Sequence, residues 1–422
     1  MSDSDMFKLP AAGKPLARNW GTHFSSESNR PPCILKQAAG YIKTPGLISL
    51  GGGLPSSEYF PISEIAMRVP MAPNFSEKQH LLDLPASGAQ TARIVCQTVG
   101  STGALERTVR MLCDRFKNES ILTEDYTFAT AMETFIPQGI KDEIARGARK
   151  PHLLYTVPSG QNPTGATQSV ERRREVYKVC QKHNIFIIED EPYYFIQMKP
   201  YTGRGIDVLV NETVDEFLAS LIPSYLSMDV DGRVLRMDSF SKVLVPGSRL
   251  GWITASKQVI QRYLCRAEVA NQGPSGISQL IIWKLVDETW GHDGYLKWLI
   301  DLRTNYTRRR NELLAACEDY LPTDIASWIP PAAGMFLWVK LDHTKHPDCQ
   351  RRSLDEIEEE IFRHSIDQGV LFARGSWFRA EPHTELNELF LRVTFASAAE
   401  VDMCTAVQRL SAAIKKSFRI EP

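Results

Sequence analysis

The chain has 422 residues, which is long for one domain and ordinary for two domains that share a core. Apolar residues make up 43% of it and charged residues 23%, the balance of a soluble globular protein. Its formal net charge is −1, so nothing indicates nucleic acid or an anionic membrane as a partner. No apolar run approaches the length that crosses a bilayer.

The eight cysteines are scattered along the chain, and no two have the spacing of a zinc site or a redox pair. Single cysteines within apolar runs, such as Cys96 and Cys113, indicate reduced core residues and a reducing compartment. The first five residues are acidic, unlike a secretion signal or a mitochondrial presequence. We therefore expect a cytoplasmic location and no metal site.

The first 45 residues are polar and rich in proline, with little periodicity. A short strand then runs into three glycines and a proline, Gly51-Gly-Gly-Leu-Pro55. Glycines let the backbone approach a ligand because no Cβ intervenes, although a simple turn is the alternative reading of a glycine run. Residues 62–92 contain several turn formers and no convincing long helix.

The segment Arg93–Val99 predicts a buried strand that stops at Gly100-Ser-Thr-Gly103, where an amphipathic helix begins. A turn of small residues between a strand and a helix offers free backbone amides and the positive end of the helix dipole to a phosphate. Ser101 and Thr102 are therefore candidate phosphate ligands. The alternative is an ordinary strand-to-helix turn.

Three further apolar strands end in polar side chains. The strand from Ile121 ends at Tyr126, the strand from His152 leads into a loop that holds Asn162 between prolines and glycines, and the strand from Ile185 ends at Asp190. Tyr193 follows within three residues. An acid at the end of a buried strand is either a helix cap or the partner of a cation. Alternating strands and helices from about 93 to 255 predict a mainly parallel, doubly wound α/β sheet, whose carboxyl edge binds ligands.

The stretch Val234–Trp252 contains a buried strand, a break at Asp238-Ser-Phe-Ser241, and then Lys242, with Arg249 seven residues later. Desolvation disfavours the charged ammonium, so a lysine held between buried strands becomes a nucleophilic amine that can form a Schiff base. Ser239 and Ser241 with Arg249 suit a bound phosphate. A surface loop with a solvated lysine is the alternative.

Beyond Trp252 the pattern is helical to about residue 320, and the run Arg308, Arg309 and Arg310 reads as a solvated helix face. A second unit of strands and helices follows and predicts a small α+β domain. Arg392 interrupts its last apolar strand. A lone arginine there needs an anion, either an internal carboxylate or that of a ligand.

Taken in order, these residues resemble the fold-type I, aspartate-aminotransferase-like family of pyridoxal-phosphate enzymes. The similarity is greatest to fungal aromatic amino acid aminotransferases and to kynurenine/2-aminoadipate aminotransferases. The matching stretches are Gly51–Pro55, Gly160–Gly165, Glu189–Phe195, Met237–Lys242, Pro246–Arg249 and Phe390–Arg392.

The resemblance implies that Lys242 holds the cofactor as a Schiff base and then moves the proton between the substrate Cα and the cofactor. It implies that Asp190 pairs with the pyridine nitrogen, that Asn162 and Tyr193 bind the phenolic oxygen, and that Tyr126 stacks on the ring. The phosphate is assigned to Ser101, Thr102, Ser239 and Arg249. The substrate α-carboxylate is assigned to Arg392, with Gly53 and Asn162 lining that pocket.

The implied reaction is ping-pong transamination of an aromatic, kynurenine-type or 2-aminoadipate-type L-amino acid with a 2-oxo acid such as 2-oxoglutarate. The implied assembly is a homodimer. Residues 1–60 are expected to form an N-terminal arm and part of the small domain, 61–295 the large cofactor-binding domain, and 296–422 the small C-terminal domain.

Two segments look short for the family, near 85–92 and near 138–150, where a helix and a further strand with its helix are expected. A shortened, weakly active or inactive cofactor-binding form is therefore an alternative. A second alternative is another reaction on the same cofactor, such as β-elimination. A cofactor-binding transcription regulator is disfavoured, because the first 45 residues are too short and proline-rich for a DNA-binding helix-turn-helix.

Overall fold

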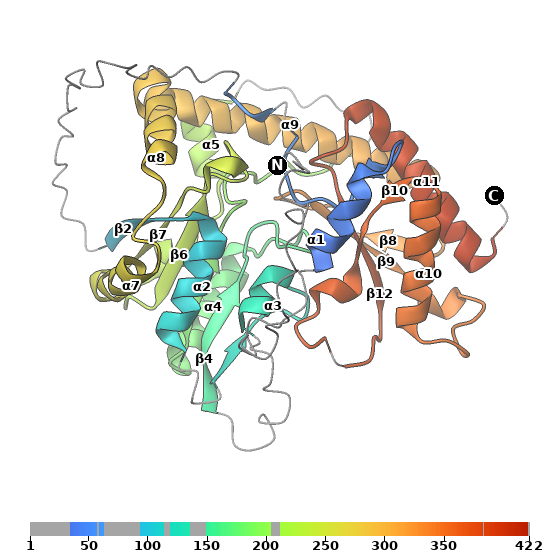
Figure 1. Cartoon of the computed structure of the whole chain (residues 1–422), viewed down its shortest axis with the longest axis horizontal. Coiled ribbons are helices and arrows are strands. Elements are labelled where there is room, and N and C mark those ends of the chain that lie inside the picture. Colours follow the sequence, from blue (N-terminus) through green and yellow to red (C-terminus); the bar gives the residue numbers. More distant parts are fainter. Residues whose placement is uncertain are drawn as a thin grey trace, which may run out of the picture.

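In the computed structural model, placement is described for residues 34–56, 59–62, 93–113, 119–135, 149–203, 212–382 and 384–420. Figure 1 shows a large sheet with helices around it, a smaller unit of strands and helices beside it, and the long helix α9 (Gly291–Tyr320) running along both. None of the described helices has the length and apolarity to cross a membrane.

The large sheet has six strands in the order β2-β7-β6-β5-β4-β3. Strands β3 to β6 are mutually parallel, and β7 is antiparallel to both of its neighbours. This confirms the mainly parallel sheet that the sequence predicts. The strands are β2 (Arg93–Thr98), β3 (Glu119–Leu122), β4 (Arg149–Thr156), β5 (Phe186–Asp190), β6 (Val234–Ser239) and β7 (Gly251–Ser256).

The helices of the large unit connect these strands and contribute apolar side chains to its core. Because connections between parallel strands must cross over, most of these helices lie in the crossover segments. They are α2 (Gly100–Leu112), α3 (Ala129–Phe135), α4 (Val170–Lys182), α5 (Val214–Ser220), α6 (Tyr225–Met228), α7 (Lys257–Ala270) and α8 (Gly276–Trp283), with a π-helical turn at Lys284–Thr289 before α9.

The smaller unit contains an antiparallel sheet in the order β11-β12-β9-β8, with α10 (Leu354–Asp367) and α11 (Glu400–Phe418). Its strands are β8 (Ala326–Trp328), β9 (Phe336–Leu341), β11 (Ala373–Arg374) and β12 (Leu389–Thr394). A separate parallel pair joins β1 (Ile48–Ser49) to β10 (Val370–Leu371), and α1 (Ile34–Ala38) precedes it. Residues close to the N-terminal end of the described chain therefore pack with its C-terminal part.

The predicted domain boundaries at 60/61 and 295/296 remain predictions. The second falls inside α9, which continues without a break from Gly291 to Tyr320.

Two expectations about burial are wrong. Strand β2 is not a buried strand but the edge of the sheet in the described part of the chain, because it pairs only with β7, and Val95 is 60% exposed. The arginine run is not a solvated face, since Arg309 and Arg310 are buried. Their guanidiniums donate to backbone carbonyls, Arg309 Nε to Phe395 O (2.7 Å) and Arg310 Nη1 to Pro331 O (3.0 Å), which fixes α9 against loops of the smaller unit.

The two segments predicted to be short lie almost wholly outside the described residues, which resume at β2 and β4. Within the described part, β3 has β4 as its single strand partner and therefore forms the other edge of the sheet. The expected loss of a family strand next to β3 falls on residues 136–148, outside the described residues, and stays a prediction.

Candidate active site

Lys242 follows the fully buried strand β6. Its Nζ donates a 2.6 Å hydrogen bond to the carbonyl oxygen of Gly53. Burial, and after it the positive charges of Arg392 and Arg249, lower the pKa of Lys242 to about 8, while the negative charge of Asp190 opposes them. An amine with such a pKa is partly unprotonated near neutral pH, as a nucleophile requires. The reading as a solvated loop lysine is therefore wrong.

Asp190 is the last residue of β5 and is buried. Its Oδ2 accepts a 2.9 Å hydrogen bond from the hydroxyl of Tyr155, whereas its Oδ1 has no hydrogen-bond partner among the described residues. Burial raises the pKa of Asp190 to about 7, and the hydrogen bond from Tyr155 partly offsets this effect. A buried carboxylate oxygen without a partner is costly unless a ligand supplies a donor. The arrangement fits a cationic ring N–H.

Tyr155 is a site residue that the sequence reasoning missed. It lies on β4, next to β5, and is fully buried. The available signal was a tyrosine within the apolar run from His152 to Val157. A buried tyrosine usually needs a hydrogen-bond partner for its hydroxyl, and the strand-end acid of the neighbouring strand is a natural one.

The turn predicted to bind phosphate, Gly100-Ser-Thr-Gly103, and the loop that carries Arg249 meet at the start of α2. Gly100 has φ +64°, and a Cβ built on it would lie 2.6 Å from Nη2 of Arg249. The Arg249 guanidinium therefore lies directly over the first residue of the helix, whose next residues are Ser101 and Thr102. Backbone N–H groups in the first turn of a helix have no partner within the helix. Together with a guanidinium they form an anion-binding corner.

Two serine side chains complete this corner. Arg249 Nη1 donates to Ser241 Oγ (3.2 Å), and the hydroxyls of Ser239 and Ser241 lie 2.9 Å apart. The buried hydroxyl of Ser101 lies near Asp190, where it lowers that carboxyl's pKa without meeting hydrogen-bond geometry. Ser101 thus connects the phosphate corner to the carboxylate.

Arg392, on β12, is buried between two aromatic rings, with its guanidinium 4.3 Å from the centroid of Phe336 and 4.6 Å from that of Phe378. Nη1 donates to Asn162 Oδ1 (2.8 Å) and Nη2 to Gly51 O (2.7 Å). Burial lowers the pKa of Arg392 to about 10. Because a guanidinium has five N–H donors, both Nη atoms keep a second hydrogen for a carboxylate.

The loop with Asn162 is held against the smaller unit by a close backbone contact. Gly160 has φ +57°, and a Cβ there would lie 2.5 Å from the backbone of Ala333 and of Gly334. Only glycine permits this approach. It brings Asn162, from the large unit, to Arg392, from the small one. Since Asn162 accepts through Oδ1, its amide NH₂ remains able to donate.

Tyr193 is buried, and its ring lies edge-on to Phe336 at 5.9 Å between centroids. Burial raises its pKa, and a hydrogen bond with the Asn162 side chain partly offsets this. The two residues assigned to the phenolic oxygen are thus neighbours.

Tyr126 borders the same loop, because its carbonyl accepts from Gln161 Nε2 (2.6 Å). Its ring packs edge-on against Trp338 and Phe390 of the smaller sheet, at 5.2 and 5.3 Å between centroids. Its stacking on a cofactor ring stays a prediction.

The described residues suit the aldehyde, the ring nitrogen, the phenolic oxygen and the phosphate of pyridoxal 5′-phosphate. A buried amine, an unpaired carboxylate oxygen, an amide donor beside a tyrosine hydroxyl, and an anion corner at a helix start lie around one site. The glycine segment connects Arg392 and Lys242, since the carbonyls of Gly51 and Gly53 accept from Arg392 and Lys242 respectively. The individual roles remain predictions.

Residues 137–410 match the family model described as aminotransferase class I and II. An aromatic amino acid aminotransferase of Schizosaccharomyces pombe is 37% identical, over 97% of this chain and 100% of the relative. A mitochondrial kynurenine/alpha-aminoadipate aminotransferase of Bos taurus is 35% identical over 66% of this chain and 58% of its own length. The solved structure of the Candida albicans aminotransferase Aro8 is similar with a TM-score of 0.73 at 34% identity, covering 96% of this chain and 100% of that one.

The alignment with the Schizosaccharomyces pombe relative extends over 480 positions, although it includes 97% of the 422 residues, or about 409. About 70 aligned positions therefore face gaps in this chain. The matches with the Schizosaccharomyces pombe and Candida albicans proteins nevertheless extend over 97% and 96% of the chain. The chain belongs to the class I and II aminotransferases, and its cofactor is pyridoxal 5′-phosphate.

Proposed function

We propose that this aminotransferase transfers the amino group of an aromatic L-amino acid, or of one of the kynurenine or 2-aminoadipate type, to a 2-oxo acid such as 2-oxoglutarate. The observation that carries the proposal is the buried amine of Lys242, held on Gly53 O within the electrostatic reach of Asp190, Arg249 and Arg392. The substrate class is supported by the relatives. Besides the aromatic aminotransferase of Schizosaccharomyces pombe, a protein of Tapinella panuoides named L-tyrosine:2-oxoglutarate aminotransferase is 36% identical over 67% of this chain.

Bound pyridoxal phosphate supplies an electron sink that stabilises negative charge at the substrate Cα. In our proposal Lys242 would hold the cofactor through Nζ. With substrate bound, the same nitrogen would accept the proton from the substrate Cα and later return it. Its lowered pKa suits both roles, because a general base works best with a pKa near the working pH.

Asp190 would keep the ring nitrogen protonated through Oδ1, which has no partner among the described residues, while Tyr155 fixes Oδ2. An ionised carboxylate beside the nitrogen favours the protonated ring. Asn162 and Tyr193 would orient the phenolic oxygen, and Ser101, Thr102, Ser239 and Arg249 would hold the phosphate.

Arg392 would bind the α-carboxylate of the substrate with its remaining N–H donors, between the rings of Phe336 and Phe378. Because Asn162 Oδ1 and Gly51 O fix the guanidinium, it is oriented before substrate arrives. The amino acid leaves as its 2-oxo acid, and a second 2-oxo acid returns the amino group in the reverse half-reaction. We propose a cytoplasmic homodimer as the working form, with small-molecule substrates and neither nucleic acid nor membrane as a partner.

A second candidate is a shortened form that binds the cofactor but turns over slowly. About 70 positions of the Schizosaccharomyces pombe relative face gaps here, and β3 is an edge strand in the described part of the sheet. Exposed edges and lost core surface matter to domains that are stable by only about 5–15 kcal/mol.

Purified protein supplied with pyridoxal phosphate tests these readings. We expect a visible absorbance band that L-phenylalanine or L-tyrosine bleaches and 2-oxoglutarate restores. Lys242→Ala should lose the band, and the matched control Lys257→Ala, at an exposed position at the start of α7, should keep it. Bleaching without restoration by any 2-oxo acid would contradict transamination. A full band with turnover far below that of the relatives would support the shortened form.

A further inference from the structure

Helix α4 has three consecutive arginines near its start, Arg172 to Arg174, of which only the middle one is buried. Arg172 and Arg174 are exposed, whereas Arg173 is completely inaccessible to solvent. Removing a guanidinium from water is costly unless its donors find partners. Arg173 meets that condition, because all of its guanidinium nitrogens have partners close to the active site.

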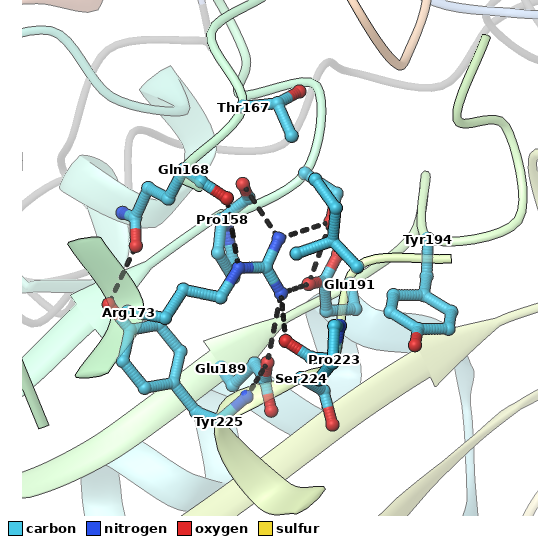
Figure 2. Close-up of polar contacts among 12 residues, drawn as sticks. Pro158, Thr167, Gln168, Arg173, Glu189, Glu191, Tyr194, Pro223, Ser224 and Tyr225 are labelled. Carbon is cyan, nitrogen blue, oxygen red and sulfur yellow. Dashed lines mark hydrogen bonds and ion pairs between the residues drawn. The ribbon is translucent and has the colours of Figure 1, made fainter. Parts of the chain in front are cut away.

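Figure 2 shows the Arg173 guanidinium between segments from several parts of the chain. Its Nη2 donates to Pro158 O (3.1 Å) and Ser159 Oγ (2.9 Å), and its Nη1 to Glu191 Oε1 (3.2 Å) and Pro223 O (3.2 Å). Its Nε donates to Gln168 O (3.2 Å). All three guanidinium nitrogens are engaged, so the side chain has one arrangement.

Three of these partners are close in sequence to residues of the cofactor site. Pro158 and Ser159 open the loop that carries Asn162, and Glu191 directly follows Asp190. Ser159 also donates to Glu191 Oε1 (2.9 Å), which joins the loop to the strand end a second time. One side chain therefore connects the backbone on either side of the cofactor position.

A further partner of Arg173, Pro223, connects another segment to the same strand. Pro223 precedes α6, whose first amides bind Glu189, with Tyr225 N at 2.7 Å and Leu226 N at 3.0 Å from its carboxylate oxygens. Because successive strand residues point to opposite faces, Glu189 lies on the far side of the sheet from Asp190. Arg173 and α6 thus hold β5 from the face of the sheet opposite Asp190.

The charges around Arg173 strengthen this connection. Glu191 Oε1 lies 3.2 Å and Glu189 Oε1 3.9 Å from Arg173 Nη1, and the second buried guanidinium nearby, Arg236, is committed to Asp238 at 2.7 Å. Burial, and then the negative charge of Glu189, raise the pKa of Glu191 to about 8, while Arg173 opposes them. Without Arg173, the carboxylates of Glu189 and Glu191, which flank Asp190 in the sequence, would lack their nearest cation.

We propose that Arg173 is a positioning residue of the cofactor site, which sets Asp190 and Asn162 at the spacing that the pyridine nitrogen and the phenolic oxygen require. It touches neither substrate nor cofactor and acts through the Pro158–Ser159 loop and Glu191. The proposal rests on the assignment of Asp190 and Asn162 in the proposed function.

The test compares Arg173→Gln and Arg173→Lys with the exposed neighbours Arg172→Gln and Arg174→Gln as matched controls. The cofactor dissociation constant is measured by titrating apoprotein with pyridoxal phosphate. The pH midpoint of the bound cofactor's absorbance and the melting temperature are also measured. Kinetics with L-tyrosine at saturating cofactor separate kcat from KM.

We expect Arg173→Gln to weaken cofactor binding by about 10- to 100-fold, as is typical when a residue that orients ligating groups is lost. The pH midpoint should move, kcat should fall, and KM for the amino acid should change less than about twofold, because Arg392 is untouched. Arg173→Lys keeps the charge without the fork that reaches five acceptors, so its cofactor affinity should be intermediate. Both controls should behave as wild type.

A folded Arg173→Gln protein with wild-type cofactor affinity and an unmoved pH midpoint would overturn the proposal, because a purely structural arginine changes only the melting temperature. If Arg173→Gln does not fold, wild-type cofactor affinity in Arg173→Lys overturns it instead. Wild-type protein that takes up no cofactor would overturn the proposed function as well. Equal effects in the Arg173 variants and the controls would overturn this proposal alone.

Discussion

Replacing Asp190 by asparagine should stabilise the cofactor-free protein at neutral and alkaline pH while it destroys function. The carboxyl is buried, its Oδ1 has no partner among the described residues, and burial raises its pKa to about 7. An aspartate in an unfolded chain has a pKa of about 4. The folded state therefore binds the proton more tightly than the unfolded state, and ionising Asp190 weakens folding.

The sign and size follow from proton linkage. Since the folded pKa is raised, the contribution of Asp190 to stability is complete below pH 4 and is lost as the pH rises through 7. The interval between the two pKa values corresponds to roughly 4 kcal/mol, at 1.36 kcal/mol per pH unit. Between pH 5 and pH 8 the loss amounts to about 2.5 kcal/mol. Asparagine does not titrate, so the variant escapes this loss.

The assay is chemical denaturation of apoprotein between pH 5 and pH 8, for wild type, Asp190→Asn and the exposed control Asp287→Asn. The free energy of unfolding of Asp190→Asn minus that of wild type should increase by about 2.5 kcal/mol over this range. Any fixed effect of the unpaired amide is the same at each pH and cancels. For the control, the free energy of unfolding of Asp287→Asn minus that of wild type should be the same at every pH.

A flat difference for Asp190→Asn would refute the reasoning, because it would mean that the carboxyl is not desolvated in the folded state. With cofactor added, the same variant should lose more than about 100-fold in kcat, since a neutral amide does not hold the ring nitrogen protonated. A variant that is more stable without cofactor and inactive with it is the combination expected of a functional carboxylate.

Three further substitutions test the site. Tyr155→Phe removes the 2.9 Å hydrogen bond to Asp190 and should weaken cofactor binding by about 10-fold, measured by titration, with little change in KM for the amino acid; an unchanged dissociation constant would contradict the role of Tyr155. Gly100→Ala places a Cβ 2.6 Å from Arg249 Nη2 at φ +64°, so we expect about 1 kcal/mol lower stability in urea and weaker phosphate binding, seen as a raised dissociation constant for pyridoxal phosphate but not for pyridoxal. Arg392→Lys keeps the charge but loses the fork, so kcat/KM for L-tyrosine should fall by about 100-fold, mainly through KM, while cofactor affinity stays constant; an equal loss of cofactor affinity would argue against a substrate role.

Much of the site is local in the sequence, and there the predicted placement of residues at the ends of strands is confirmed. Lys242 follows a buried strand and Asp190 ends one, so their depth follows from the apolar runs beside them. The parallel order of the sheet follows from alternating strands and helices. Because the carboxyl ends of parallel strands share an edge, the meeting of these two residues was predictable as well.

Burial of polar side chains was less predictable. The arginine run on α9 reads as a solvated face, yet Arg309 and Arg310 are buried on loop carbonyls. On α4, sequence does not distinguish Arg173 from its exposed neighbours. Whether a charged side chain can be buried depends on which backbone groups arrive from elsewhere, and no periodicity encodes that.

The order of the matching stretches along the chain indicated the family. The sequence by itself also determined the order of strands and helices and the candidate groups for the cofactor site, because each depends on residues within a few positions of one another. Only the tertiary structure decided which atoms those groups have left to offer. Tyr155 occupies one oxygen of Asp190 and leaves the other unpaired, and Asn162 and Gly51 orient Arg392. These contacts join residues 35 to 341 positions apart in the chain, so they exist only once the sheet and the smaller unit have packed together.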